Sequence, residues 1–459
     1  MFRSHAHRNI VMTEGSLWKS TLLFALPIFL SGLLQLFFNA ADTIVVGRFA
    51  GQEALAAVGS VGSLNALLVN IFLGLSIGAN VIVARAIGAG DYKNVHSAVH
   101  TSITVSMICG VLLAFIGYFA ARPLLLLMGT PEDVIDLATL YVRIIFLGMP
   151  VQLLYNFSAS ILRAVGDTKR PLYFLSAAGI VNVLLNLFFV IVFKMSVAGV
   201  ALATVISHFV STGLVIHSLL TRNDAVRLDP RQLRINRKIL WQIMRIGLPS
   251  GVQSSMFSIS NILIQSSINS FGTIAMAGSA AAANLCSFIY QAVAAFQNTA
   301  TTFTGQNMGA RKPYRVLKTQ YVCQIWCLIA TGVMGVGNYI FGEQLLSLYN
   351  TDPEVIAYGM QRIAVANAPY FLMGMQSVFS GGLRGMGYSF LPMCISLCGI
   401  CLTRVIWLAT AFRAYPTMTC LMLSHPVSWL FTLLFMGPFF FIYYNRLKKN
   451  CSAQELSAE

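Results

Sequence analysis

Residues 26–43 read Leu-Pro-Ile-Phe-Leu-Ser-Gly-Leu-Leu-Gln-Leu-Phe-Phe-Asn-Ala-Ala-Asp-Thr, an apolar run with one acid near its end. The run belongs to the segment 17–45, which is long enough to cross a bilayer as a helix. Gln35, Asn39 and Asp42 are spaced by four and three residues, so they share one face of that helix. Apart from Asp136 in the first turn of the span 134–162, Asp42 is the only acid within an apolar segment, and an ionisable residue there marks an ion or substrate path. The alternative is a carboxylate that reaches the interface from the helix end.

The rest of the chain has the composition of a membrane protein. Of its 459 residues, 57% are hydrophobic and 10% are charged, whereas soluble domains carry about 25% charged residues. Long apolar segments alternate with short loops, which predicts an all-α integral membrane protein with twelve spans. The expected spans are 17–45, 55–84, 95–121, 134–162, 171–193, 197–220, 239–270, 275–304, 317–341, 355–383, 388–412 and 416–445.

The net charge of +15 is unevenly distributed along the chain. If both termini are cytoplasmic, the inner segments carry 22 Lys or Arg, Arg384 among them, and the outer loops carry four. This bias follows the positive-inside rule and explains the basic composition without a nucleic-acid partner. We therefore expect a multi-pass protein of the cell (inner or plasma) membrane with both termini in the cytoplasm.

The second half of the sequence repeats the first. Pro27 recurs as Pro249, and the pattern Leu-Arg-x-x-Gly-x-x-x-x-Pro at 162–171 recurs at 383–392, so the offset between the copies is nearly constant. Each half holds six spans, so the halves have the same orientation and form parallel repeats. The repeat predicts two homologous six-helix bundles facing a central cleft. The expected parts are a cytoplasmic tail 1–16, an N-lobe 17–220, a basic cytoplasmic linker 221–238, a C-lobe 239–445 and a cytoplasmic tail 446–459.

Polar residues of the first half suit a cation site. Asn182 and Asn186 share a face of the fifth span, Asn156 lies on the fourth and Thr204 on the sixth. A carboxylate from Asp42 with amide and hydroxyl oxygens could hold H⁺ or Na⁺. For the two asparagines alone, hydrogen bonds that hold helices together are an equal alternative. We expect no cofactor and no metal other than a Na⁺ at Asp42.

The second half lacks a matching acid, because Ile264 occupies the position equivalent to Asp42. Its spans carry scattered neutral amides, which fit the wall of an adaptable substrate cleft. His425 is either a second proton carrier or a structural imidazole beside a proline kink. The residues predicted to line the cleft, from both halves, are Gln35, Asn39, Gln253, Met256, Asn261 and Gln291.

The sequence offers no catalytic constellation. It has no Walker loop and no HExxH helix. The nine cysteines fall almost wholly in apolar segments and are expected to pack as small hydrophobic side chains. We therefore expect a transporter and not an enzyme, with a channel as the less favoured alternative.

Several motifs, in order and in part duplicated, resemble those of the MATE family (multidrug and toxic compound extrusion). They run from Met12 to Asn445 and comprise Met12-Thr-Glu-Gly, the 27–42 helix, Val46-Gly-Arg-Phe, the Gly88-Ala-Gly loop, the 162–171 motif and Gly305-Gln-Asn-x-Gly-Ala. The resemblance implies a secondary antiporter that exports organic cations in exchange for H⁺ or Na⁺.

The resemblance also assigns residue roles. It implies a cation-coupling site at Asp42, Asn156, Asn182, Asn186 and Thr204, with Gln35 as a neighbour in the cavity. Some members have Asp where this chain has Asn186, and Phe257 stands where another subgroup carries an acid. Small organic cations and the lipid bilayer are the expected partners, with no obligatory protein partner. The alternative function is a lipid-linked oligosaccharide flippase of the same superfamily, which would line its cleft with several Arg or Lys.

Overall fold

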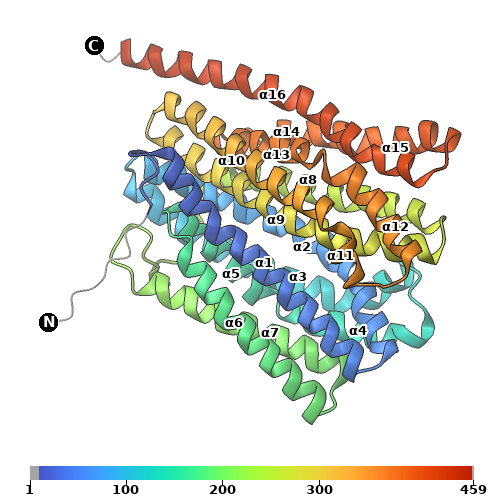
Figure 1. Ribbon diagram of the computed structural model, residues 1–459. Coiled ribbons are helices and arrows are strands. Elements are labelled where there is room, and N and C mark those ends of the chain that lie inside the picture. Colours follow the sequence, from blue (N-terminus) through green and yellow to red (C-terminus); the bar gives the residue numbers. More distant parts are fainter. Residues whose placement is uncertain (1–9, 457–459) are drawn as a thin grey trace. The chain divides into compact units, whose positions relative to one another are not determined.

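The computed structural model describes residues 10–456, and the side chains in that range except those of 60, 63–68 and 450–456. Every regular element within these residues is helical, which confirms the predicted fold class (Figure 1). The α-helices and the shorter π and 3₁₀ segments (η) are α1 Leu17–Phe49, α2 Gln52–Gly88, α3 Tyr92–Leu127, α4 Glu132–Leu147, α5 Met149–Ala164, α6 Lys169–Leu187, η1 Phe188–Val192, α7 Ser196–Leu220, η2 Pro230–Gln232, α8 Arg237–Asn269, α9 Thr273–Gly309, α10 Pro313–Ile340, α11 Gly342–Ser347, α12 Pro353–Arg362, η3 Ile363–Asn367, α13 Tyr370–Gly385, α14 Phe390–Ser396, η4 Leu397–Leu402, α15 Thr403–Trp407, η5 Leu408–Phe412 and α16 Met418–Leu456.

Most of the predicted spans are long and apolar enough to cross a membrane. Within the described residues nine helical segments meet this condition, and the pair α4 and α5, bent by 47° around Gly148, makes a tenth. The other two predicted spans correspond to α8 and to α12, η3 and α13, which are helical but more polar. These two carry Gln253, Asn261, Arg362 and Arg384. The chain is an integral, multi-pass membrane protein.

The helices repeat with the period that the sequence predicts. The offset between Gln52 and Thr273, which begin α2 and α9, equals the offset between Gly88 and Gly309, which end them. The same offset relates both ends of α5 to those of α13. It also relates the start of α3 to that of α10, and the start of α4 to that of α12. The duplication is therefore a property of the backbone and not only of the motifs.

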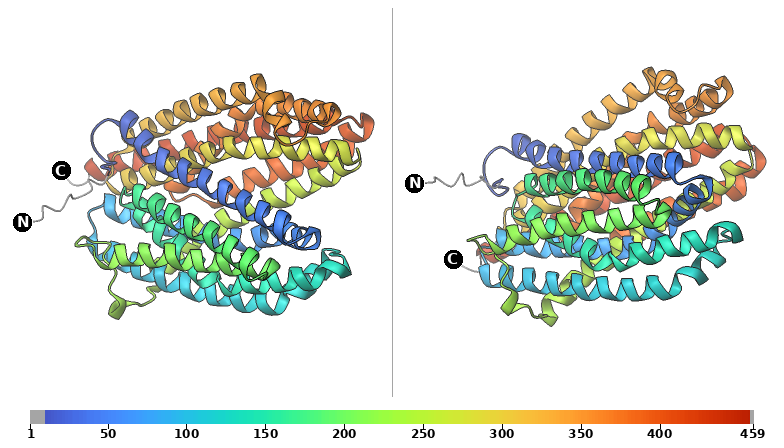
Figure 2. Two further views of the ribbon diagram at one scale, coloured as in Figure 1. Left: turned by 60° about the horizontal axis from the view of Figure 1, so that its bottom comes forward. Right: turned by 90° about the horizontal axis from the view of Figure 1, so that it is seen from below.

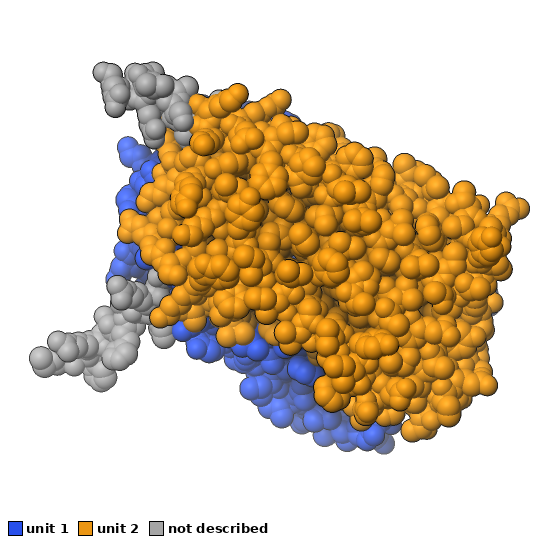
Figure 3. Space-filling view, turned by 45° about the horizontal axis from the view of Figure 1, so that its top comes forward, with its two compact units in different colours: residues 1–12, 30–251 blue, residues 13–29, 252–459 orange. Residues whose placement is uncertain are grey.

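The chain forms two compact units whose bounds differ from the predicted lobes (Figure 3). Unit 1 comprises residues 1–12 and 30–251, and unit 2 comprises 13–29 and 252–459. The divisions fall within α1 and α8, shortly after Pro27 and shortly after Pro249. The first part of α1 thus belongs with the second half of the chain, and the first part of α8 with the first half.

Within unit 1, glycines allow the first part of α8 to approach α2 closely. A Cβ atom on Gly74 would meet the backbone of Gly251, and one on Gly78 would meet the backbone of Gly247. Membrane helices use such small residues because close backbone approach increases packing contact. On the other side of this unit, α6 and α7 lie side by side, as the green helices of Figure 2 show.

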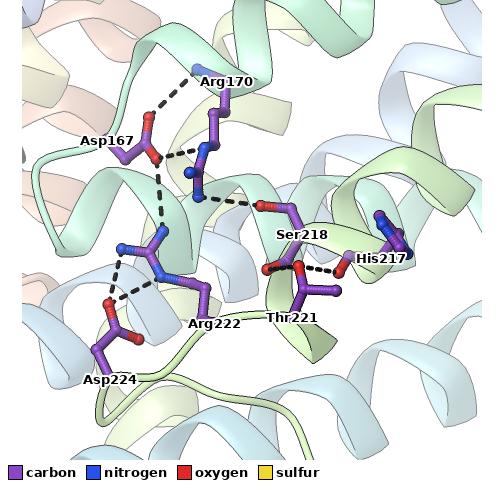
Figure 4. A network of polar contacts seen from close by, with 7 residues as sticks. All are labelled: Asp167, Arg170, His217, Ser218, Thr221, Arg222 and Asp224. Carbon is purple, nitrogen blue, oxygen red and sulfur yellow. Dashed lines mark hydrogen bonds and ion pairs between the residues drawn. The ribbon is translucent and has the colours of Figure 1, made fainter. Parts of the chain in front are cut away.

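The basic linker is anchored to unit 1 by buried charges. Arg222 forms ion pairs with Asp167 (3.4 Å) and Asp224 (2.8 Å), and Arg170 approaches the same Asp167 oxygen at 3.5 Å (Figure 4). Asp167 belongs to the 162–171 motif, so this motif holds the beginning of the linker against the connection between α5 and α6. Only 7% of the Asp167 side chain is exposed, which makes this pair far less accessible to water than a surface ion pair.

Candidate functional site

The predicted coupling site lies where α1 approaches α6 in unit 1. A Cβ atom on Gly179 would overlap the ring of Phe38, so only glycine lets the two helices come this close. One turn beyond Phe38 on α1 is Asp42, and two turns beyond Gly179 on α6 is Asn186. The glycine therefore positions the acid against the amide.

A chain of hydrogen bonds connects four of the predicted residues. The amide nitrogen of Asn186 donates to Asp42 Oδ1 and, at 3.4 Å, to Asn182 Oδ1. The amide nitrogen of Asn182 donates to Thr204 Oγ1 at 3.4 Å. Asp42 is half-buried, whereas Asn182 and Asn186 are buried. One carboxylate is thus held by neutral polar groups inside a helical bundle.

One acceptor at this site has no donor among the described residues. It is Asn186 Oδ1, a buried oxygen on the amide whose nitrogen binds Asp42. Unpaired buried acceptors are uncommon in native proteins, because a lost hydrogen bond to water is not replaced. Amide and carboxylate oxygens are groups that can ligate Na⁺, and the carboxylate can also take up a proton. The described residues contain no cluster of three His, Cys, Asp or Glu that could hold another metal.

The helix itself is altered directly after the site. α6 ends at Leu187 and continues as the π-helical segment η1. Wide π-turns are rare and occur often at functional sites, because they shift the side chains that follow. No local pattern in the sequence indicates this change of winding.

Comparison with known proteins identifies the family. The MatE family model matches residues 27–188 and 249–410, once in each half of the chain. The chain belongs to the MATE family. The predicted resemblance is therefore confirmed, and the protein is a membrane transporter and not an enzyme.

Two curated relatives and one solved structure agree with this. The chain is 31% identical over 396 residues to the probable multidrug resistance protein YoeA of Bacillus subtilis, covering 84% of this chain and 85% of that protein. It is 25% identical over 389 residues to the FAD transporter of Shewanella oneidensis, covering 83% and 85%. A MOP superfamily transporter from Pyrococcus furiosus shares the fold, with a TM-score of 0.90, 21% identity and coverage of 96% and 99%.

The fifth residue that the MATE resemblance assigns lies apart from the hydrogen-bonded chain. The Asn156 amide donates to the carbonyl of Gln152, on its own helix. Tyr141 on α4 interacts electrostatically with Asp42, and sequence reasoning missed it. A lone tyrosine in an apolar span carries no periodic or motif signal that could have marked it. The coupling role of these residues stays a prediction.

The MATE resemblance also names Gln35 as a neighbour of Asp42 in the cavity. Gln35 and Asn39 are exposed on α1, while Asp42, on the same predicted face, is half-buried. The Asn39 carbonyl accepts a hydrogen bond from the Thr43 hydroxyl, one turn further on. The polar stripe of α1, which consists of Gln35, Asn39 and Asp42, therefore begins on an accessible part of unit 1 and ends at the site.

The predicted cleft residues of the second half lie in unit 2, where two of them bind arginines. Gln253 is buried, donates to Ser396 at 2.6 Å and accepts from Arg384 at 2.6 Å. Asn261 is exposed and accepts from Arg404 at 3.1 Å. Gln253 is therefore occupied inside unit 2, and its amide does not present a free group to a substrate.

The remaining predicted positions of unit 2 are placed as follows. Met256 and Gln291 are half-buried, and the Met256 carbonyl accepts from the Cys401 thiol at 3.4 Å. His425 is buried with its ring 5.7 Å from that of Trp429. Ile264 packs in an apolar cluster, as expected for a position without an acid. The role of His425 as a second proton carrier stays a prediction.

Sequence reasoning places one residue of unit 2 wrongly. The charge pattern assigns Arg384 to a basic cytoplasmic loop, but it lies inside α13 and is only 5% exposed. The equivalent residue of the first half, Arg163, likewise lies in the last turn of α5, so in both halves the helix extends past the predicted end of the span. The signal that could have corrected this prediction is the absence of acids from the neighbouring segments.

Proposed function

We propose that this MATE protein is a secondary active multidrug efflux antiporter that exports organic, cationic compounds in exchange for H⁺ or Na⁺. The observation that carries the proposal is the bonded chain from Asp42 through Asn186 and Asn182 to Thr204 within unit 1. This bonded chain contains a single carboxylate inside a helical bundle, and the neutral polar groups that hold it can also ligate a cation.

The proposed exchange follows from charge. When Asp42 is ionised, its carboxylate attracts a cationic substrate to the polar stripe of α1 that includes Asn39. When H⁺ or Na⁺ binds to Asp42, the negative charge of the carboxylate is neutralised. Asn186 then holds the neutralised carboxyl group by its hydrogen bond. Ion and substrate then stabilise different states of the protein, which is the requirement for coupled exchange.

Two further expectations belong to the same proposal. The B. subtilis relative is named as a probable multidrug resistance protein, which supports drugs as the cargo. The charge bias of the loops supports a location in the cell membrane with both termini in the cytoplasm. A flippase for lipid-linked oligosaccharides is the alternative that the transport test must exclude.

Ethidium efflux from membrane vesicles tests the proposal, with pH and Na⁺ gradients imposed separately. Wild type is expected to move the dye with one gradient, and Asp42→Asn is expected to reduce that movement to the level of empty vesicles. Asp136→Asn is the matched control, because the Asp136 side chain is 78% exposed in an ion pair far along the chain from the site.

Two results would contradict the proposal. Wild type that moves ethidium and other organic cations under neither gradient would make the flippase the function to test. An Asp42→Asn variant that transports as well as wild type would remove Asp42 from the coupling site and make His425 the next candidate.

A further inference from the structure

Unit 2 buries arginines in a stretch of chain that has no acids. The sequence contains no Asp or Glu between Asp229 and Glu343, and none between Glu354 and Glu455. Yet Arg384 is 5% exposed and Arg404 is 2% exposed. Charged side chains are almost never buried unless an opposite charge accompanies them. The opposite charge for these guanidinium groups is therefore not supplied by the chain around them.

The partners of these arginines are neutral. Arg404 binds through Nε and Nη1 to three side chains on two helices, and Arg362 binds through Nη1 to α9. In the part of the chain that the structure describes, no ion pair involves Arg362, Arg384 or Arg404. The acceptors are Ser428 Oγ (3.3 Å), Ser260 Oγ (3.1 Å) and Asn261 Oδ1 (3.1 Å) for Arg404, and Ser279 for Arg362.

Arg362 and Arg404 act on one group of aromatic side chains. Arg404 is connected to His425 through Ser428, whose hydroxyl accepts from Arg404 Nε at 3.3 Å and donates to the His425 carbonyl at 2.8 Å, and the charges of both arginines act on Tyr370 and His425. The ring of Trp429 lies 5.1 Å from that of Tyr370 and 5.7 Å from that of His425. The two guanidinium groups and the three rings thus belong to one interior region of unit 2.

This region holds donors that have no acceptor among the residues described. They are Trp429 Nε1 and Arg362 Nε, while His425 Nδ1 also lacks a partner. Trp429 is 3% exposed, so its indole N–H is removed from bulk water. Unpaired donors and unpaired positive charge at one place suit an acceptor that carries negative charge. A planar guanidinium fits carboxylate and phosphate oxygens in particular.

An accessible residue leads to this region. Asn261 is exposed on α8, and its side-chain oxygen accepts directly from Arg404 Nη1. An anion arriving at Asn261 would therefore meet the guanidinium group by displacing one neutral hydrogen bond. The aromatic rings of the same region suit a ligand whose charged group is attached to a ring.

We propose that unit 2 contains a binding site for the carboxylate or phosphate group of a small aromatic organic anion, formed by Arg404 and Arg362 with Tyr370, Trp429 and Asn261. In transport terms the inference rests on the proposed function, since it adds anionic or zwitterionic molecules to the cargo. Binding of the anion itself does not depend on Asp42 or on the coupling ion.

Fluorescence anisotropy of fluorescein, an aromatic carboxylate, tests the site in the purified full-length protein in an uncharged detergent. Wild type is expected to bind the dye saturably. Arg404→Gln is expected to weaken binding about 10-fold or more, as loss of a charge-assisted contact does. Asn261→Asp is expected to do the same, because its carboxylate would occupy the guanidinium group.

Asn261→Asp keeps the test meaningful if Arg404→Gln does not fold. Its internal ion pair is expected to leave the melting temperature equal to that of wild type or higher, while dye binding falls. Arg143→Gln is the matched control, because Arg143 lies in a span of unit 1 and already rests on the Tyr118 ring at 5.0 Å. This control is expected to bind fluorescein as wild type does.

Three results would overturn the proposal. They are the absence of saturable fluorescein binding to wild type, equal binding by wild type and Asn261→Asp, and displacement of the dye by dihexanoyl phosphatidylglycerol at lower concentration than by benzoate or phenyl phosphate. The last result would assign the arginines to a lipid phosphate. Ethidium transport by the same purified protein after reconstitution into vesicles separates the two proposals, since a protein that binds fluorescein but moves no cation retains the anion site and loses the cation antiport.

Discussion

The helix that carries Asn182 and Asn186 in unit 1 and the helical segment around Arg404 in unit 2 occupy equivalent places in the repeat. Both are followed by a π-helical segment, η1 at 188–192 and η5 at 408–412. In unit 1 the charge near this helix is the half-buried acid Asp42, whose partner is the neutral amide of Asn186. In unit 2 the buried charge is positive, and its partners are also neutral.

The difference shows that duplication has kept the backbone and reversed the charge. Thr403 and Trp407 replace the two asparagines, and Ile264 replaces Asp42. A repeated scaffold therefore allows one unit to be specialised for a cation and the other for an anion. The repeat predicts where the helices run, but the sign of each site must be read from its own residues.

The strongest test of this comparison exchanges equivalent residues of the two units. Asn186→Leu is expected to reduce gradient-driven ethidium transport about 100-fold or more, because the half-buried Asp42 carboxylate then loses its donor. Trp407→Leu, at the equivalent position of unit 2, is expected to change it only slightly, since the indole binds the Cys420 carbonyl and not a charged group. Initial rates in vesicles with equal protein content measure both. Equal losses in the two variants would argue that the units are not specialised.

A second test uses the acid of the repeated motif, which unit 1 has and unit 2 lacks. Asp167 corresponds to Tyr388, and it forms the buried pair with Arg222. Asp167→Asn is expected to lower the free energy of unfolding by about 2 kcal/mol, because it removes the buried one of the two carboxylates that pair with Arg222 and leaves only the more exposed Asp224. Unfolding by SDS titration measures the loss.

The control for this test is the exposed pair of Arg122 and Asp136. Their side chains are 55% and 78% exposed, so Asp136→Asn is expected to cost about 0–1 kcal/mol. A loss in Asp167→Asn as small as that of the control would mean that the linker is held by other contacts.

A third test addresses the helix contact that only unit 1 needs. Gly179→Ala is expected to destabilise unit 1 by about 2 kcal/mol and to lower ethidium transport, since its methyl group would enter the Phe38 ring. Gly213→Ala, where a Cβ atom meets nothing within 4 Å, is expected to be neutral or slightly stabilising. Transport and melting temperature of the two variants are compared. Normal transport in Gly179→Ala would show that close approach of α1 and α6 is dispensable.

The smallest expected effect concerns the linker, which has no counterpart in the repeat. Hydrogen bonds from the Arg231 backbone and the Gln232 side chain hold the pKa of Asp229 below its ordinary value. A lowered native pKa stabilises the folded protein above about pH 4, and this contribution disappears as pH falls through that native pKa. Melting temperatures of wild type and Asp229→Asn are therefore expected to differ slightly at pH 7 and to converge toward pH 3. A difference that grows on acidification would reverse the assigned sign.

Sequence patterns predicted the scaffold well because hydrophobic length and repeat period are properties of many residues together. The twelve helical segments, the duplication and the family could be predicted because each depends on a pattern that many residues share. The bond from Asn186 to Asp42 was also foreseeable, since the spacing of Asn182 and Asn186 gives one polar face. The bend at Gly148 and the π-helical segments were not, because they depend on packing that no local pattern encodes.

The sign of the second site escaped prediction for a different reason. In the sequence Arg362 and Arg404 are isolated basic residues, and the repeat motif suggests a loop position for Arg384. Their significance depends on tertiary contacts, such as that of Arg404 with Asn261, and on the absence of any nearby acid. The bounds of the two units differ from those of the predicted lobes, because α1 and α8 are each continuous in sequence while their contacts change partner after Phe29 and Gly251.

That division of α1 and α8 has a consequence for the origin of the protein. Residues 17–29 open the first helix of the first half but belong to unit 2, and residues 237–251 open the first helix of the second half but belong to unit 1. The exchange is reciprocal, as in a domain-swapped homodimer. An unduplicated ancestor with this fold would have completed its bundle only by borrowing a helix end from a second copy. Gene fusion would then have made an obligate pair of subunits into one polypeptide.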